Sequence, residues 1–348
     1  MAGTMERMQG TETKMELPDG FAIRAATMED LSAAKEIADL CDIDVIGQRT
    51  GFSSRFDIFW TSPDCEIERD VRVIEGEDGK VVAFAHVLCD PPHVRARVIG
   101  YVSPQFCGRG LGTLLMSWGE GRSREKTERA PSGARTKMQQ WVLAGDERSA
   151  ALMRGHGLKV VRHFVYMITD LDGAPEAPVW PKGIELRPVT LGEHGRLIAR
   201  TDDEVFRDHW GFAPMTEEEH YERFKHWMEN DPELDVNLWY VAWSGEEIAG
   251  LLLCWPKAED NPEIGYLGVL GVRRPWRGKG LGLALLRHAF GEFYRQGKKQ
   301  AALHADAENL TGALRLYHKA GMRIHRRFEH YEKELRPGVE LATTALGD

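Results

Sequence analysis

The sequence has few cysteines, no long apolar run and no excess of positive charge. Its five cysteines are widely spaced among 348 residues and form no Cys-x-x-Cys pair, which argues against a disulfide framework or a zinc site. The longest apolar stretches, such as Ile248 to Pro256, are well short of the roughly 20 residues that cross a bilayer. Because 45 Lys and Arg face 54 Asp and Glu, overall charge does not favour binding to nucleic acid or to anionic membranes. We expect a cytoplasmic globular protein with no metal, no nucleic-acid partner and no membrane segment.

A proline-rich stretch divides the chain into two parts of similar length. A chain of 348 residues exceeds what one hydrophobic core usually organises. Residues 171–183 hold three prolines within seven positions, a pattern that opposes both a helix and a central strand. The N-terminal residues carry no apolar segment of the kind found in secretory signals. We predict a flexible tail at 1–19, a first domain at 20–170, a linker at 171–182, a second domain at 183–337 and a C-terminal tail at 338–348.

The two halves share a glycine-rich segment. Residues 102–112 read Val-Ser-Pro-Gln-Phe-Cys-Gly-Arg-Gly-Leu-Gly, and residues 272–282 read Val-Arg-Arg-Pro-Trp-Arg-Gly-Lys-Gly-Leu-Gly. At a constant offset of 170 positions, the valine, an aromatic residue, the glycines, a basic residue and the leucine recur in step. This repetition indicates an internal duplication.

The alternation of apolar and polar residues predicts a mixed α/β fold. In the second half we expect strands at 184–189, 238–243, 248–254, 266–272 and 301–306, helices at 191–206, 216–230, about 282–296 and 310–320, and an extended stretch at 322–335. In the first half, 71–75 and 81–88 form a hairpin across a glycine-containing turn. Residues 48–65 show no assignable pattern.

The segment from Arg277 to Gly282 has the composition of an anion-binding turn. It lies between an apolar strand and a helix, where unpaired backbone N–H groups and the positive end of the helix dipole converge. Its three glycines let a phosphate approach the backbone, and Arg277 and Lys279 add positive charge. Leu283 stands where a dinucleotide-binding motif has its third glycine, so NAD is disfavoured, and no Walker motif for ATP is present. A tight turn that needs glycine only for its backbone angles is the alternative.

The pattern Arg-x-x-Gly-x-Gly after a strand resembles the acyl-CoA pyrophosphate loop of the GNAT superfamily of N-acetyltransferases. Residues 306–309 and 313–322 resemble the later strand-to-helix segment of that superfamily. The resemblance implies two tandem GNAT-like acyl-CoA N-acyltransferase domains, acetyl-CoA as cofactor and a small-molecule amine as acceptor. It leaves open a non-catalytic acyl-CoA sensor, a protein N-acetyltransferase and, less favoured, an enzyme that uses another phosphate. Acyl-chain preference and oligomeric state are not predicted.

The resemblance also assigns roles to individual residues. The positions that match the superfamily's cofactor-binding segments are Leu270, Gly271, Val272, Arg277, Gly278, Lys279, Gly280, Leu281, Gly282 and Asn309, with Gly108, Arg109, Gly110 and Gly112 in the first half. Tyr317 matches the tyrosine near the cofactor sulfur, and a phenol with a reference pKa of about 10 is protonated and able to act as an acid at neutral pH. Packing against the sheet is its alternative role.

The base that deprotonates the amine has several candidates. Glu263 precedes the strand, His304 and Asp306 share one strand face, and Glu308 follows them. Asp306 equally suits a helix cap, and His304 a buried strand position. We retain Glu263 and Asp306 as the predicted catalytic carboxylates.

Two fused domains with the better-preserved motif in the second resemble the mycothiol synthase family. That family has a glutamate on the strand before its second loop, where this chain has Tyr266. Acceptor contacts are expected from Tyr266 and from Asp208, His209 and Trp210, which lie between the first two helices of the second half. Residues 205–212 suit an interhelical turn equally well.

The first half departs from the active pattern. Cys107 stands where the second half has Arg277, and Met153 and Gly145 stand where it has Tyr317 and Asn309. We predict a non-catalytic first half that either still binds CoA or shapes the acceptor site.

Overall fold

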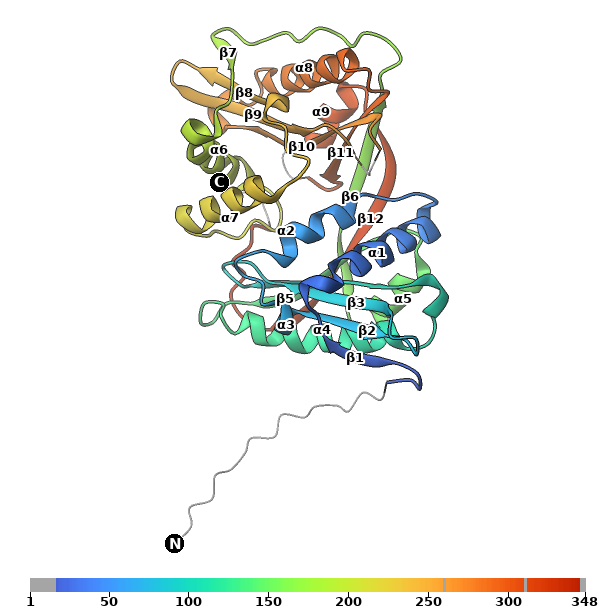
Figure 1. The fold of residues 1–348 in the computed structure, drawn as a ribbon. Coiled ribbons are helices and arrows are strands. Elements are labelled where there is room, and N and C mark those ends of the chain that lie inside the picture. Colours follow the sequence, from blue (N-terminus) through green and yellow to red (C-terminus); the bar gives the residue numbers. More distant parts are fainter. Residues whose placement is uncertain (1–16, 259–260, 310–311, 345–348) are drawn as a thin grey trace.

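One mixed sheet of 12 strands runs through both halves of the residues described by the computed structural model, which are 17–258, 261–309 and 312–344 (Figure 1). Most of the predicted N-terminal tail, the last four residues of the C-terminal tail and the predicted helix start at 310–311 lie outside these ranges. The strand order is β1-β2-β3-β4-β5-β12-β6-β11-β10-β9-β8-β7. None of the helices in these ranges has both the length and the apolar composition needed to cross a bilayer.

The first half begins with one strand, three helices and three strands, and then alternates two helices with two strands. Its elements are β1 (Ala22–Ala25), α1 (Leu31–Ile46), α2 (Phe56–Trp60), α3 (Ile67–Asp70), β2 (Val71–Glu75), β3 (Val81–Leu88), β4 (Arg95–Val102), α4 (Leu111–Thr127), β5 (Thr136–Leu143), α5 (Glu147–Gly155) and β6 (Lys159–Asp170), with short 3-10 turns at Met28–Asp30, Phe52–Arg55 and Pro104–Phe106. The predicted hairpin at 71–75 and 81–88 is confirmed. The unassigned stretch 48–65 contains a 3-10 turn and α2, which are too short to show a helical repeat.

The second half repeats this order, except that two helices follow its first strand. Its elements are β7 (Ile184–Arg187), α6 (Leu191–Phe206), α7 (Glu217–Asn230), β8 (Trp239–Ser244), β9 (Glu247–Trp255), β10 (Ile264–Val272), α8 (Leu281–Arg295), β11 (Gln300–Asp306), α9 (Ala313–Lys319) and β12 (Arg323–Arg336), with 3-10 turns at Val236–Leu238 and Arg274–Trp276. The predicted elements agree with these to within a few residues. Thr216 caps α7 by accepting a hydrogen bond from the Glu219 N–H.

The two halves exchange their last strands. Residues 164–170 of β6, in the first half, pair antiparallel with the whole of β11. In the same way, β12 of the second half pairs antiparallel with β5. Val165 and Met167 of β6 are accordingly buried in the core of the second half, and Tyr331 of β12 is buried in that of the first. Each sheet therefore depends on a strand from the other half. The predicted boundaries at 20–170 and 183–337 do not include this exchange and stay predictions.

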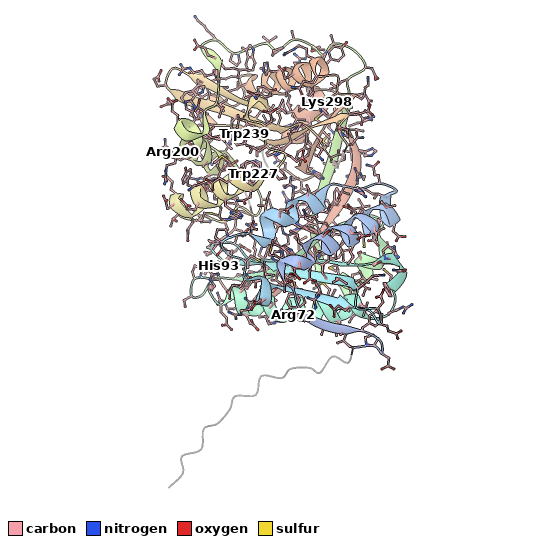
Figure 2. The ribbon with its side chains drawn as sticks, viewed as in Figure 1. Arg72, His93, Arg200, Trp227, Trp239 and Lys298 are labelled. Carbon is pink, nitrogen blue, oxygen red and sulfur yellow. The ribbon has the colours of Figure 1, made fainter. Side chains whose placement is uncertain are left out.

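Helices cover both faces of the sheet in each half. In the second half α8 and α9 pack on one face, and α6 and α7 pack on the other, where Trp227 of α7 stacks on Trp239 of β8 with ring centroids 6.0 Å apart (Figure 2). In the first half α4 covers one face, while α1 and α2 cover the other. Figure 1 places α1, α2 and α7 between the two halves, and the His226 ring of α7 bonds to the Ile58 carbonyl of α2 at 3.2 Å. Helices of both halves therefore form the layer between them.

The C-terminal segment links the halves. The Val339 carbonyl accepts a hydrogen bond from the Arg135 N–H at 2.8 Å. Four residues later, Thr343 exchanges backbone hydrogen bonds of 2.7 Å with Gly211 and Phe212. The described part of the predicted tail is thus docked on both halves.

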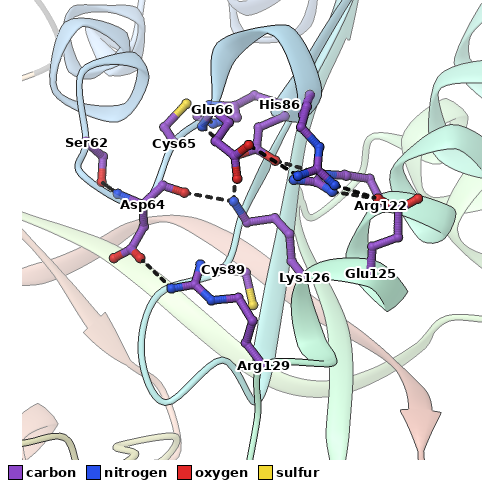
Figure 3. Close-up of polar contacts among 12 residues, drawn as sticks. Ser62, Asp64, Cys65, Glu66, His86, Cys89, Arg122, Glu125, Lys126 and Arg129 are labelled. Atoms are coloured by element: carbon purple, nitrogen blue, oxygen red, sulfur yellow. Dashed lines mark hydrogen bonds and ion pairs between the residues drawn. The ribbon is translucent and has the colours of Figure 1, made fainter.

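A buried ion network joins α3 to α4 in the first half (Figure 3). Asp70 is fully buried and accepts hydrogen bonds from Arg122 at 2.8 Å and from Lys126 at 2.6 Å. Burial alone raises the pKa of Asp70, but the hydrogen bonds and charges of these neighbours outweigh that effect and lower it. Beside this network, the buried His86 ring approaches the Cys65 sulfur at 3.5 Å. The network fixes one end of α4 against the sheet.

Candidate active site

Strands β10 and β11 separate after a short paired segment. They pair in parallel only from Ile264 to Tyr266, opposite residues 300–302. Beyond Tyr266, β10 stays with β9 while β11 stays with β6. The register of β10 shifts at Gly268, where an added Cβ would lie 2.2 Å from the Trp255 ring. The two strands are therefore splayed before the glycine loop, which directs residues 267–272 away from β11.

The glycine loop connects β10 to α8. A 3-10 turn at Arg274–Trp276 lies between β10 and the glycines, and Gly278 and Gly280 adopt φ values of 74° and 88°, which favour glycine. No atom of the described chain lies within 4 Å of a Cβ built on either residue, so the turn borders open space. At Gly282 a Cβ would lie 3.0 Å from Leu316 of α9, so this glycine allows the two helices to approach. The first N–H groups of α8 have no partner within the helix.

Asp208 holds the loop from the side of α6. Its buried carboxylate accepts hydrogen bonds from Arg274 at 2.6 Å and from Arg277. The hydrogen bond from Arg274, followed by that from Arg277, lowers the pKa of Asp208 to about 2. Arg277 also donates to the Val272 carbonyl at 2.8 Å. The structure thus places Asp208, a predicted acceptor contact, against the glycine loop.

Tyr317 lies on α9 and is 9% exposed. Burial, and next the neighbouring Tyr266, raise its pKa to about 12, so its phenol stays protonated at neutral pH. Its hydroxyl makes no hydrogen bond to the described part of the chain, and is free to serve a bound molecule. Tyr266 in turn bonds to Nδ1 of His304 at 3.1 Å.

His304 is accessible to solvent, although surrounding protein desolvates it. This desolvation, with the charges of Arg55 and Arg326, lowers its pKa to about 3. Tyr266, His304 and Tyr317 are thus brought together from β10, β11 and α9.

The candidate carboxylates lie elsewhere. Glu263 is exposed before the paired start of β10, at the opposite end of this strand from the loop. Asp306 forms a two-bond ion pair with Arg162 of β6, at 3.0 and 2.8 Å. Glu308 bonds to His163 at 3.0 Å, an interaction that lowers the pKa of this carboxyl. Glu263 is therefore not brought together with Tyr317, and Asp306 is held by a strand of the first half.

The remaining predicted residues are ordered by local contacts. The Asn309 side chain accepts a hydrogen bond from the Ala313 N–H at 3.3 Å, which ties residue 309 to the start of α9. His209 packs on Phe206 with ring centroids 4.4 Å apart. The Trp210 ring lies 5.3 Å from the Arg162 guanidinium, so it adjoins the Asp306 ion pair.

The first half keeps the loop but lacks the phenol. Gly108 and Gly110 adopt φ values of 79° and 84°, as their counterparts do, and Gly112 packs near Leu152. The guanidinium of Arg109 lies over the Phe106 ring instead of pairing with an acid. Cys107 is exposed at the position that matches Arg277, Met153 is buried at the position of Tyr317, and Gly145 occupies that of Asn309 with a φ of 97°. The first half therefore offers a loop without the residues that would carry chemistry.

Two features of the site were not predicted. The anchoring of the loop by Asp208 and the ion pair of Arg162 with Asp306 join residues 66 to 144 positions apart. No local pattern marks such pairs, although the sequence shows that Arg273, Arg274 and Arg277 have no acidic residue near them in the chain.

Comparison with known proteins agrees with this geometry. Residues 202–322 match the acetyltransferase (GNAT) family. Mycothiol acetyltransferase of Streptomyces scabiei is 28% identical over 324 residues, 91% of this chain and 96% of that protein. The crystal structure of a GCN5-related N-acetyltransferase from Sphaerobacter thermophilus is 34% identical with a TM-score of 0.73, covering 94% of this chain and all of the other. A tandem GNAT protein from the clavulanic acid biosynthesis pathway shares the fold at 17% identity and a TM-score of 0.66, over 92% of this chain.

The splayed strands, the glycine turn and the tandem fold define an acyltransferase. The chain belongs to the GCN5-related N-acetyltransferase family. The resemblance inferred from residues 277–282 and 306–322 is thereby confirmed.

Proposed function

We propose that the protein transfers an acetyl group from acetyl-CoA to the primary amine of a small molecule, with the chemistry in residues 183–337. The observation that carries this proposal is the convergence of the splayed β10, the open glycine turn and the buried phenol of Tyr317 in the second half. Its mycothiol acetyltransferase relatives support a small amine acceptor.

The glycine loop fits the diphosphate of acetyl-CoA. Gly278 and Gly280 border open space, and the N–H groups of the first turn of α8 are available to an anion. Lys279 is exposed beside them, while Arg277, anchored by Asp208, fixes the shape of the turn. When bound, acetyl-CoA supplies the acetyl thioester that the amine attacks.

Residues of β10 and α9 serve the reacting groups. In this proposal backbone N–H groups of Leu270 to Val272 polarise the carbonyl on which negative charge develops. The Tyr317 hydroxyl donates a proton to the departing thiolate, a role that its raised pKa and its lack of a hydrogen-bond partner in the described chain both support. Asn309 keeps the turn into α9 in place.

The acceptor amine is proposed to lie near Tyr266 and His304. Because the pKa of His304 is about 3, its ring stays neutral at pH 7 and can accept a hydrogen bond from the amine or from an ordered water. Asp306 would have to leave Arg162 before acting as base, and Glu263 would have to act through ordered water. Tyr266 and His304 therefore form the favoured acceptor contact, with His209 and Trp210 lining the adjoining side.

The proposal is tested by incubating a metabolite extract and a panel of primary amines with labelled acetyl-CoA. We expect acetylated small molecules and stoichiometric release of CoA thiol. Tight acetyl-CoA binding without turnover across the panel would contradict the proposal and favour a sensor. Label found only on protein N-termini would contradict a small-molecule acceptor.

A further inference from the structure

Four arginines gather where the first half faces the second. Arg95 and Arg97 lie two positions apart on β4 and therefore share one face of the sheet. Arg55 directly precedes α2 and Arg223 lies on α7. The charges of Arg55, Arg95 and Arg223 all act on Arg97. Within residues 17–258, 261–309 and 312–344, the side chains of Arg55, Arg95 and Arg97 make no hydrogen bond or ion pair.

The carboxylate whose charge acts on Arg97 is already engaged. Asp90 is the carboxylate whose charge acts on Arg97, and it is held by Arg223 at 2.6 Å. The Arg97 guanidinium lies 5.3 Å from the Phe59 ring centroid, so an aromatic face flanks it while its N–H donors stay without an acceptor in the described chain. Arg97 is only partly exposed, and desolvation lowers its pKa. A guanidinium is costly to desolvate without an anionic partner.

The acids near Arg95 are engaged as well. Glu332 and Glu340 act on Arg95, but both pair with the buried Lys137, at 3.3 and 2.8 Å. Asp90, which also acts on Arg95, is held by Arg223 as described above. The group therefore has more guanidinium charge than the neighbouring carboxylates neutralise.

This group is linked to the proposed acceptor position. Arg97 is the last residue of β4 that pairs with β5, just as Tyr266 is the last residue of β10 that pairs with β11. Arg97 thus occupies in the first half the place that Tyr266 occupies in the second. The charge of Arg55 acts on both Arg97 and His304, so Arg55 is within electrostatic reach of both the arginine group and the Tyr266–His304 pair.

We propose that Arg97, with Arg95 and Arg55, binds an oxyanion of the acceptor, so that the acceptor is an amine that also carries a carboxylate or a phosphate ester. Paired guanidinium N–H groups match such oxyanions in two-bond geometry. The inference rests on the proposed function and assigns to the first half the recognition of the acceptor. The same positive charge favours the neutral, nucleophilic form of the amine that enters beside it.

The test measures oxyanion binding separately from catalysis. Inorganic phosphate is titrated calorimetrically into the full chain with saturating CoA, which occupies diphosphate sites. We expect Arg97→Leu and Arg55→Leu each to weaken phosphate binding by about tenfold or more, the loss of one charge-assisted pair. Arg154→Leu removes an equally charged, exposed residue of the first half and serves as the matched control. Arg55 is exposed, so its variant stays informative if Arg97→Leu fails to fold.

The kinetic arm compares acceptors that differ only in the anion. Glucosamine 6-phosphate is set against glucosamine, and an amino acid against its amide. We expect a lower KM for one anionic member, and loss of that preference in Arg97→Leu with kcat largely kept. Phosphate binding and acceptor preference that are unchanged in both variants would overturn the inference. Absence of turnover with all amines would contradict the proposed function instead, while the phosphate titration would still decide the oxyanion site.

Discussion

Replacing Tyr317 by phenylalanine isolates the proposed general acid. The hydroxyl makes no hydrogen bond to the described chain, so its removal takes no protein contact away, and the melting temperature should stay within about 1 to 2 °C, as for substitutions that break no interaction. Loss of a positioned acid should lower kcat by about 10²- to 10⁴-fold, or about 3 to 5 kcal/mol of barrier. The Kd for acetyl-CoA should be unchanged.

The assay is single-turnover thiol release at saturating acetyl-CoA and acceptor. Tyr240→Phe is the matched control, because Tyr240 lies in the same core cluster and its buried hydroxyl also lacks a partner in the described chain. This control should keep full activity. Since the pKa of Tyr317 is raised to about 12, kcat of the wild type should show no decline from phenol ionisation between pH 8 and 10. A Tyr317→Phe rate within about threefold of the wild type, well below the range for a lost acid, would refute this role.

Three further perturbations have definite expected outcomes. Gly280→Ala should raise the KM for acetyl-CoA by about tenfold, because a side chain at a φ of 88° costs about 1 to 2 kcal/mol and the added methyl enters the diphosphate space. Gly110→Ala, at a φ of 84° in the first half, should leave this KM unchanged. Equal effects of the two substitutions would contradict the assignment. Asp70→Ala should lower the free energy of unfolding in urea by about 3 to 5 kcal/mol, because it removes the carboxylate that pairs with the buried Lys126 and leaves Arg122 with the more exposed Glu125. A loss below about 1 kcal/mol would count against the network in Figure 3. Burial lowers the pKa of His86 from 6.5 in the unfolded chain to about 3 in the folded protein. The free energy of unfolding should therefore fall as the pH drops below about 6.5, by about 2 kcal/mol at pH 5 from this residue. His86→Leu should make the free energy of unfolding depend less on pH in this range.

Most elements of the second half could be predicted because their signals are local. Glycine at 297 ends α8, a two-residue turn at 245–246 joins β8 to β9, and α6 begins and ends where the apolar repeat does. The glycine turn was also predictable, since its spacing repeats in both halves. Resemblance added the role of Tyr317, which no periodicity shows.

The strand exchange could not be predicted from such signals. β6 and β12 are both long strands, and nothing local distinguishes pairing within a half from pairing across the halves. The burial of Val165 with the second half and of Tyr331 with the first is decided by contacts between distant residues.

The electrostatic part of the site was hidden for the same reason. The residues around Asp208 have the composition expected of an acceptor contact, but the partners of Asp208, Arg274 and Arg277, lie 66 and 69 positions away. Arg97 and Arg55 are unremarkable in sequence, and only the fold brings their charges together.

A crystal structure of the protein with CoA tests the central claim most directly. The account predicts that the diphosphate lies on the backbone N–H groups of Gly278 to Gly282, and that the sulfur lies within hydrogen-bond reach of the Tyr317 hydroxyl. A cofactor bound only at the loop of residues 108–112, or bound in the second half with its sulfur away from Tyr317, would contradict it.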